Sequence, residues 1–222
     1  NPHGIWYTPV TGIWQTVWAE AVPATYIAST KQTPDIDKKT VTVAAMIEKG
    51  QPGDQVMVTA WDGSTKVAEQ TVAPGSEASL SIDNPKLWSP QSPFLYDLKY
   101  SVVRKGKVVD EVKSYFAMRK ISMAPDRAGI QRMLLNNQFV FQYGPLDQGW
   151  WPDGLYTAPT DEALKFDIEK TKEMGFNMIR KHVKVEPARW YTHCDRMGML
   201  VWQDMPSGDL GNRWESRPGI YG

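Results

Sequence analysis

Two patterns of hydrophobic and polar positions divide the chain. In the second half, residues 160–174 and 187–197 carry apolar side chains at helical spacing, and a glycine ends each pattern. Each glycine is followed by a short apolar run of strand length, at residues 177–180 and 199–202. Helices that alternate with short strands are typical of βα units, so this half is predicted to contain a parallel sheet.

The first half of the chain instead alternates apolar and polar side chains with a period of two. Turn-forming residues such as Gly, Pro and Asp separate these runs, and no helical pattern interrupts them. About seven short strands with regular turns are typical of an immunoglobulin-like sandwich. The strands are predicted at residues 26–30, 40–48, 55–61, 66–72, 78–82, 94–103 and 107–116.

The two patterns give a multidomain protein of the β plus α/β class, with three segments. Residues 1–22 are predicted to contain one alternating strand, which needs a partner because a lone strand is unstable. Residues 23–117 form the sandwich and residues 118–222 the α/β segment. Within the last segment a hairpin is predicted, and residues 140–143 are the candidate first strand of the parallel sheet. We expect the chain to begin and to end partway through folded domains.

Composition and charge exclude several classes of protein. The 25 basic and 25 acidic residues cancel, which argues against a nucleic-acid binder and against a polybasic membrane anchor. No apolar run reaches the roughly 18 residues that a membrane-spanning helix needs. The single cysteine, Cys194, excludes an internal disulfide and is expected to be a buried structural thiol. Most of the ten tryptophans are expected in cores, although tryptophan also lines carbohydrate sites.

Polar side chains follow both strands of the predicted βα repeat. Arg180 and His182 come at the end of one strand, and Gln203 and Asp204 follow Trp202 at the end of the next. The carboxyl ends of parallel strands face the ligand in α/β folds, so we expect these side chains to meet at one edge of the sheet. Asp204 could also cap a loop, and Arg180 could form a structural ion pair.

A loop rich in Gly, Pro, Asp and Trp precedes the first predicted helix of the α/β segment. Loops of this length in compact domains are often functional. Asp147, Trp150 and Trp151 in this loop could form the wall of a sugar subsite, and a core position for the two tryptophans is the alternative. No histidine has a partner at metal-ligand spacing, and neither a metal nor a cofactor is expected.

Three segments resemble glycoside hydrolase family 2, the group of β-galactosidases, β-glucuronidases and β-mannosidases. Residues 12–18 (GIWQTVW) resemble the last strand of its jelly-roll domain. Residues 87–96, with 115–121 (YFAMRKI), resemble the end of its immunoglobulin-like domain. Residues 177–180 (NMIR), with 200–204 (LVWQD), resemble the second and third strands of its (β/α)8 TIM barrel. The segments occur in the order in which the family has them.

The resemblance implies retaining hydrolysis of O-glycosidic bonds in oligo- or polysaccharides, which uses two carboxylates about 5–5.5 Å apart. The family carries its acid/base in an Asn-Glu pair after the fourth barrel strand and its nucleophile on the seventh. This sequence has no Asn-Glu pair, so both catalytic residues are expected beyond Gly222 and the chain alone is expected to be inactive. Its partners would be a carbohydrate substrate and the remaining domains of the parent enzyme.

The resemblance also assigns supporting roles. Arg180 corresponds to the strand-two arginine that holds the nucleophile region, and Asp204 to an acidic residue that contacts the sugar. Trp202 precedes it as in β-mannosidase-like sequences. The family more often has Arg-x-x-His, whereas here His182 follows Arg180 by two residues and Val183 takes the third position.

Two readings without catalysis remain open for the sandwich. It could be a carbohydrate-binding module with Trp61 and Trp88 as a stacking platform, or a scaffold that only positions neighbouring domains. The family's polysaccharide-degrading members suggest a periplasmic or secreted protein, while low cysteine use also fits the cytoplasm. The sugar and the oligomeric state are left open.

Overall fold

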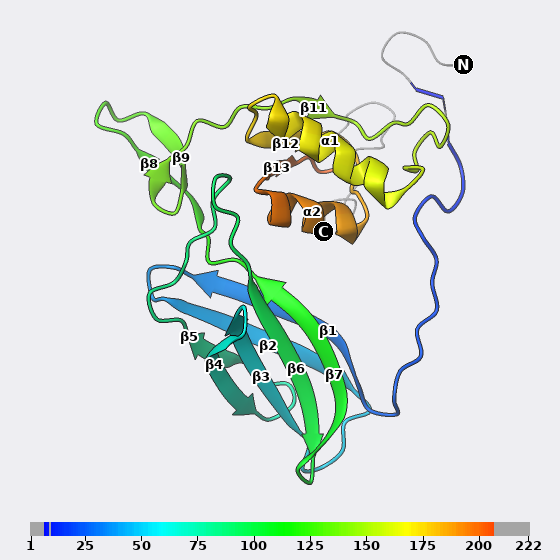
Figure 1. Cartoon of the computed structure of the whole chain (residues 1–222), viewed down its shortest axis with the longest axis vertical. Helices are drawn as coiled ribbons and strands as arrows, with labels where there is room; N and C mark the ends of the chain where they lie inside the picture. Colours follow the sequence, from blue (N-terminus) through cyan, green and yellow to red (C-terminus); the bar gives the residue numbers. More distant parts are fainter. Residues whose placement is uncertain (1–6, 9, 207–222) are drawn as a thin grey trace, which may run out of the picture.

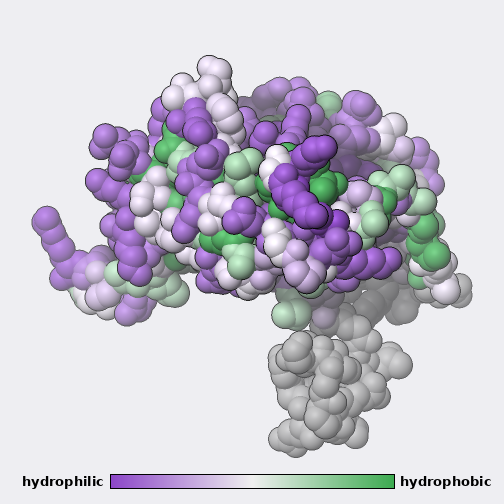
Figure 2. Space-filling view, turned by 90° about the horizontal axis from the view of Figure 1, so that it is seen from below, coloured by the Kyte–Doolittle hydropathy of each residue, from purple (hydrophilic) through white to green (hydrophobic). Residues whose placement is uncertain are grey.

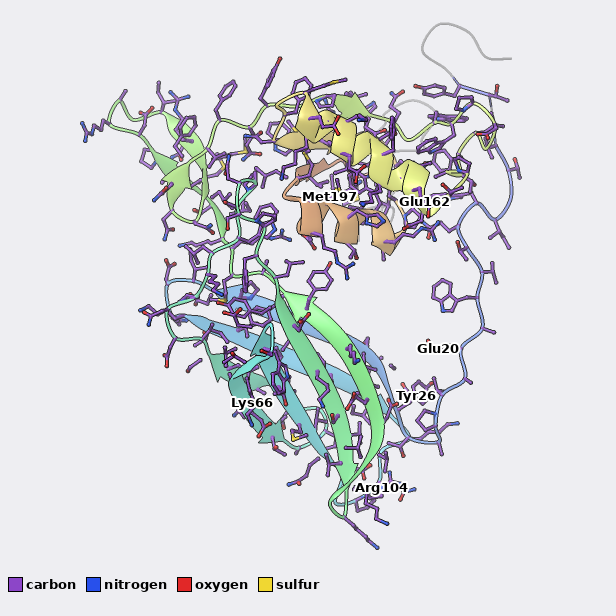
Figure 3. The ribbon with its side chains drawn as sticks, in the orientation of Figure 1. Glu20, Tyr26, Lys66, Arg104, Glu162 and Met197 are labelled. Atoms are coloured by element: carbon purple, nitrogen blue, oxygen red, sulfur yellow. The ribbon has the colours of Figure 1, made fainter. Side chains whose placement is uncertain are left out.

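The computed structural model describes residues 7, 8 and 10–206 of the chain, and the fold is mostly β-sheet with few helices. A two-sheet sandwich lies at one end of the molecule and a small α/β unit at the other, with a β-hairpin beside them (Figure 1). Glu162 and Met197 lie on the two helices, and Arg104 lies at the opposite end of the molecule, at the far end of the sandwich (Figure 3).

The sandwich consists of a three-stranded sheet, β1-β2-β5, and a four-stranded sheet, β4-β3-β6-β7, whose neighbouring strands are all antiparallel. All seven predicted strands are present, and the bounds of β2 and β7 match the prediction. The bounds are β1 Tyr26–Asp35, β2 Thr40–Glu48, β3 Gln55–Asp62, β4 Thr65–Val72, β5 Ala78–Ser81, β6 Tyr96–Arg104 and β7 Lys107–Phe116.

The core of the sandwich follows from the alternation that predicted its strands. In β2, Val41, Val43 and Ala45 are buried while the residues between them are not, so every second side chain faces the other sheet. Aliphatic and aromatic residues from both sheets complete one buried cluster. The outer surface at the end distant from the helices is predominantly hydrophilic, with scattered hydrophobic residues (Figure 2).

The segment between the sandwich and the α/β unit differs from the prediction. A three-stranded antiparallel sheet forms from β8 (Ile121–Pro125), β9 (Gln131–Leu135) and β10 (Gln138–Phe139), and β8 was not predicted. The candidate strand at residues 140–143 is absent. The first parallel strand is β11 (Leu146–Asp147). The side chain of Asn177 bonds the backbone of Phe141 and Tyr143, and its backbone N–H donates to the Tyr143 carbonyl.

The α/β unit has the predicted order of elements. Its sheet, β11-β12-β13, is parallel and includes β12 (Met178–Lys181) and β13 (Leu200–Gln203). The helices are α1 (Asp161–Glu173) and α2 (Ala188–Met197). Thr160 caps α1 by accepting a bond from the backbone N–H of Ala163, and Gly198 ends α2 in the left-handed conformation that glycine favours.

The two helices cover one face of this sheet. Ile179 of β12 packs with apolar residues of α1 and α2, and Cys194 is buried in the same cluster, as expected. Burial also raises the pKa of the Cys194 thiol. Neither helix, nor any other in the described part of the chain, is long and apolar enough to cross a membrane.

The predicted strand within residues 1–22 does not form in the described part of that segment. Residues 10–23 run outside the sandwich as extended chain, from the α/β unit to the start of β1 (Figure 1). The alternation is present, but Ile13, Val17 and Trp18 are each at least 75% exposed. A period-two pattern produces a strand only where a neighbouring strand accepts its hydrogen bonds, and no described strand lies beside this segment.

Trp88 joins the sandwich to the α/β unit. Its indole is fully buried in a cluster with Ala117, Leu135, Met178 and Leu200, which come from the sandwich, the hairpin and the parallel sheet. The indole N–H donates to the backbone oxygen of Asp195 in α2 over 2.7 Å.

Arg119 reinforces this junction. Its guanidinium lies 4.6 Å from the centre of the Trp88 ring and forms an ion pair of 2.7 Å with the Asp195 carboxylate. Tyr115 donates to the same carboxylate over 2.9 Å. The junction is therefore a packed interface with directional bonds, and it fixes the α/β unit on the end of the sandwich.

We expect Trp88→Ala to lower the free energy of unfolding by about 3–5 kcal/mol, because it leaves a cavity in the junction and removes the bond to Asp195. Urea denaturation measures this change. Trp18→Ala is the control: Trp18 is 77% exposed, and such surface substitutions usually change stability by less than about 0.5 kcal/mol. Equal effects of the two substitutions would contradict the role of Trp88.

Candidate functional site

The register of the parallel sheet brings three of the predicted site residues together. Arg180 of β12 pairs with Trp202 of β13, and Lys181 pairs with Gln203, so the two strands end at the same level. The chain then leaves the sheet at His182 and at Asp204. Since the strands run parallel, their carboxyl ends meet at one edge, and Arg180, His182 and Asp204 converge there.

The carboxylate of Asp204 is the centre of this group. Arg180 donates to both of its oxygens, from Nε to Oδ1 over 3.1 Å and from Nη2 to Oδ2 over 3.0 Å. The Nδ1 atom of His182 lies 2.5 Å from Oδ2. The bidentate contact between Arg180 and Asp204 is the strong form of an arginine–carboxylate bond. The hydrogen bonds from Arg180 and then His182 lower the pKa of Asp204 below its usual value, so the carboxylate is held in the ionised form.

Trp202 stands beside Arg180 on the open face of the sheet. Its indole N–H donates to the side-chain oxygen of Gln142 over 2.5 Å, and its side chain is 40% exposed. An exposed ring that is held by a hydrogen bond next to a fixed carboxylate presents an apolar surface and a polar acceptor together. This combination suits a sugar, which has an apolar C–H face and a rim of hydroxyl groups.

A second group of charges surrounds the end of β12, and three of its side chains, Lys181, Lys184 and Glu186, are almost fully buried. Lys181, whose side chain is 1% exposed, donates to Asp147 over 2.5 Å and to Glu186 over 2.9 Å. Lys184 is equally buried and lies 3.1 Å from Glu186. Buried charges are costly unless they are paired, and here each ammonium has a carboxylate partner. Burial lowers the pKa of Lys184, and its pairing with Glu186 opposes this shift.

Asp147 belongs to this second group through its contact with Lys181, and it also lines a surface hollow with Trp150. Its Oδ2 accepts from Lys181 and its Oδ1 accepts from the backbone N–H of Gly149 over 2.7 Å. The backbone oxygen of Asp147 also accepts from the N–H of His182 over 2.8 Å. Asp147 therefore fastens the end of β11 to the end of β12.

The sequence patterns gave no indication of roles for Lys181, Lys184 and Glu186. A strand alternates its faces, so Lys181 shares the helix-covered face with Ile179, where an apolar residue is normal. A lysine at such a position, followed closely by an acidic residue, is the signal that could have revealed a buried ion pair.

Trp150 and Trp151 do not join the Asp204 group. Trp150 stacks on Tyr7 at a centroid distance of 4.4 Å and meets the edge of Tyr156 at 5.5 Å. Trp151 packs against the cluster between the helices and β12, which is the core position given as its alternative. Its indole N–H is buried with no hydrogen-bond partner among the described residues.

The sandwich does not display the predicted pair of stacking tryptophans. Trp88 is fully buried in the junction, and Trp61 is half-buried within β3. Stacking on a sugar needs an exposed ring face, so Trp88 cannot form part of a platform. The burial of Trp88 argues against the hypothesis that the sandwich is a carbohydrate-binding module. No group of three or more metal-ligating side chains gathers anywhere in residues 10–206.

Comparison with known proteins agrees with the resemblance seen in the sequence. Residues 25–119 match the model of the family described as Glycosyl hydrolases family 2. A putative β-glucuronidase of Formosa agariphila is 27% identical over 217 residues, which are 92% of this chain and 26% of that protein. These matches support a relationship of the chain to family 2 of the glycosyl hydrolases. A β-galactosidase of Lactococcus lactis is 28% identical over 131 residues, which are 59% of this chain and 12% of the relative.

Solved structures of glycosidases share the fold of this chain. A β-glucuronidase from Ruminococcus gnavus matches with a TM-score of 0.72 at 21% identity, over 84% of this chain and 31% of that one. A family 2 member from Bacteroides cellulosilyticus matches with a TM-score of 0.70 at 24% identity, over 81% of this chain and 25% of that one. The chain thus spans about a quarter of the length of the F. agariphila relative and less than a third of these structures.

We expect Arg180→Met to raise the pKa of Asp204, because the substitution removes the main group that stabilises the ionised carboxylate. Carbon-13 NMR of the carboxyl group during a pH titration measures this value. Since the folded pKa is lowered, the stability that this carboxylate adds is present above its unfolded pKa and is lost as the pH falls through the folded value.

Arg127→Met is the control for this titration, since it removes the same charge from an exposed residue with no ion pair in the described structure. A titration of Asp204 that is the same in both variants would show that Arg180 does not hold the carboxylate.

Proposed function

We propose that this chain is the central part of a longer retaining β-glycosidase and contributes the supporting half of its sugar-binding site. In this proposal residues 23–117 are the family's immunoglobulin-like sandwich, and residues 118–222 begin its (β/α)8 barrel. The observation that carries the proposal is the ionised Asp204 carboxylate, held by Arg180 and His182 at the carboxyl edge of a parallel sheet in a chain related to family 2.

The geometry of the sheet β11-β12-β13 supports the proposal that these strands begin a (β/α)8 barrel. All-parallel sheets are normally covered and paired, yet β11 and β13 are both edge strands in the described part of the chain. A hollow of about 600 Å³ runs along β13 and is lined by Trp202, Gln203 and Asp204, among others. A further parallel strand that pairs with β13 would fill part of this hollow and carry its own loop to the edge where Asp204 lies.

In the proposed chemistry this chain binds the sugar, and the rest of the protein supplies the catalytic carboxylates. Two further carboxylates, one acid/base and one nucleophile, would lie on later strands of the barrel. Asp204 would accept hydrogen bonds from hydroxyl groups of the sugar, and Arg180 would keep Asp204 ionised and oriented. The relatives are named as β-glucuronidases and β-galactosidases, so β-glucuronides and β-galactosides are the first substrates to compare.

The neighbouring carboxylates differ from Asp204 in their partners. Asp147 and Glu186 are both paired with the buried ammonium of Lys181, and Glu186 is almost fully buried. Asp204 is half-buried, and its side chain faces the end of the sheet beside the exposed Trp202. The lower pKa that its partners impose suits a permanent acceptor rather than a proton donor.

We expect Asp204→Asn in the complete protein to lower kcat/KM for an aryl β-glycoside by about 10- to 100-fold. Hydrogen bonds to charged groups contribute about 1.5–3 kcal/mol, and the amide replaces a charged acceptor by a neutral one. Glu162→Gln, at the start of α1, is the matched control and should leave the rate unchanged (Figure 3). An active Asp204→Asn enzyme with unaltered kcat/KM would remove Asp204 from the site.

We also expect the gene that encodes this chain to continue with an Asn-Glu pair at the end of a fourth barrel strand. A second glutamate should end a later strand, since retaining hydrolysis needs both carboxylates. Sequencing the reading frame past Gly222 tests this expectation directly. A reading frame without such a pair would leave the sandwich and the α/β unit as a scaffold and would end the catalytic proposal.

A further inference from the structure

The segment before the sandwich touches the α/β unit at one well-defined place. Residues 10–19, the N-terminal strap, lie along the outside of the molecule beside the loops that follow β11 and β12 (Figure 1). Figure 3 shows Glu20 where the strap continues toward Tyr26 and the sandwich. Of the described residues that precede Thr25, only Trp14 is partly buried, and the others are exposed.

Trp14 packs on two residues of the α/β unit. Its ring meets the edge of Tyr156 at a centroid distance of 4.6 Å, and the Lys184 ammonium lies 5.1 Å from its centre. Both distances are within the range of favourable aromatic and cation–π contacts. The Trp14 carbonyl and the Gln15 side chain also form hydrogen bonds to this unit. Thr157 donates to the Trp14 carbonyl over 2.9 Å, and Gln15 donates to the Val185 carbonyl over 3.4 Å.

The ammonium of Lys184 ties together the two ends of the loop after β11. It donates to the backbone oxygens of Gly149 over 2.7 Å and of Tyr156 over 2.8 Å. Gly149 has a φ of +64°, and a Cβ built on it would lie 2.7 Å from the Lys184 Nζ, so glycine is required there. Trp14 and Tyr156 both lie within cation–π distance of this ammonium, and the loop, Lys184 and the strap thus form one packed unit.

Hydrogen bonds of the Gln203 side chain connect this unit to Asp204. The side-chain amide of Gln203 donates to the carbonyl of Lys184 over 2.9 Å and to the carbonyl of Asp204 over 2.8 Å. Tyr191 holds Gln203 from the other side, with a bond of 2.5 Å to its side-chain oxygen, and accepts from the backbone N–H of Glu186 over 3.2 Å. A shift of residues 184–186 would therefore move Gln203 and, with it, the end of β13.

The backbone next to Lys184 is also strained. Val183 has a φ of +50°, which β-branched residues rarely adopt because the Cβ crowds the backbone. Such a conformation persists only where the surrounding contacts hold it. The contacts on Lys184 and Val185 from the strap and from Gln203 supply that restraint.

We propose that Trp14 is a positioning residue, which clamps the loop after β12 and so fixes Asp204 through Lys184 and Gln203. The part that concerns Asp204 rests on the proposed sugar-binding function. The strap is thereby coupled to the candidate site. Trp14 itself touches neither Asp204 nor Arg180 in the described structure.

The test compares Trp14→Ala with Trp18→Ala in the complete protein. Trp18 lies in the same strap, is 77% exposed and makes none of the aromatic or hydrogen-bond contacts described for Trp14. Hydrogen–deuterium exchange measured by mass spectrometry should show faster exchange in residues 148–157 and 182–187 of Trp14→Ala only. Trp14→Phe, which keeps an aromatic face over the ammonium, should restore most of the protection.

The kinetic readout separates positioning from general loss of structure. In Trp14→Ala we expect KM for the aryl β-glycoside to rise about 3- to 10-fold, the range typical of residues that act through others, with kcat nearly unchanged. Unchanged exchange in Trp14→Ala would overturn the clamp whether or not the protein is a glycosidase. Faster exchange with an unchanged KM would overturn its link to Asp204. Absence of activity in the unaltered protein would refute the proposed function, and exchange would still decide the clamp.

Discussion

The buried ammonium of Lys181 is the constraint on which the α/β unit depends. It lies between the carboxylates of Asp147 and Glu186 and 4.5 Å from the centre of the Trp190 ring, with a side chain that is 1% exposed. A charge in such a place is tolerated only if its partners stay in position. The end of β11, the end of β12 and the start of α2 are therefore fixed relative to one another, and the edge of the sheet on which Asp204 lies is set with them.

The two faces of the small sheet serve different purposes. One face packs its apolar residues and its buried charges against the helices. The other face begins with Met178 and Leu200, which pack against Trp88 of the junction, and ends with the open pair Arg180 and Trp202. The sandwich thus supports the amino ends of the strands and leaves their carboxyl ends accessible. This division is what a site at the end of a parallel sheet requires.

Local patterns predicted much of the fold because the elements obey them locally. The strands β2 and β7, the cap at Thr160 and the glycine after α2 all follow from alternation or capping chemistry. The strand predicted in residues 1–22 failed because its pattern has no partner in the described fold. The strand β8 was missed although it pairs with β9 across the short turn at residues 126–130. Which strands pair with each other is decided by the tertiary structure, and the periodicity of the sequence does not reveal it.

The candidate site was predictable to a similar degree. The meeting of Arg180, His182 and Asp204 followed from their places after two parallel strands. The burial of Lys181 and Lys184 did not, because lysine alone indicates solvent and only the three-dimensional arrangement supplies its carboxylate partners. Trp150 and Trp151 were ambiguous for the converse reason, since a tryptophan in a loop fits a core as well as a binding surface.

The most direct test is a crystal structure of the complete protein with a bound monosaccharide. If Asp204 is part of a sugar site, one of its carboxylate oxygens should lie within about 3 Å of a sugar hydroxyl, with Arg180 still on the same carboxylate. A sugar bound at the carboxyl edge of the barrel without contact to Asp204 would contradict this role. A sugar found only on the sandwich would contradict the site as a whole.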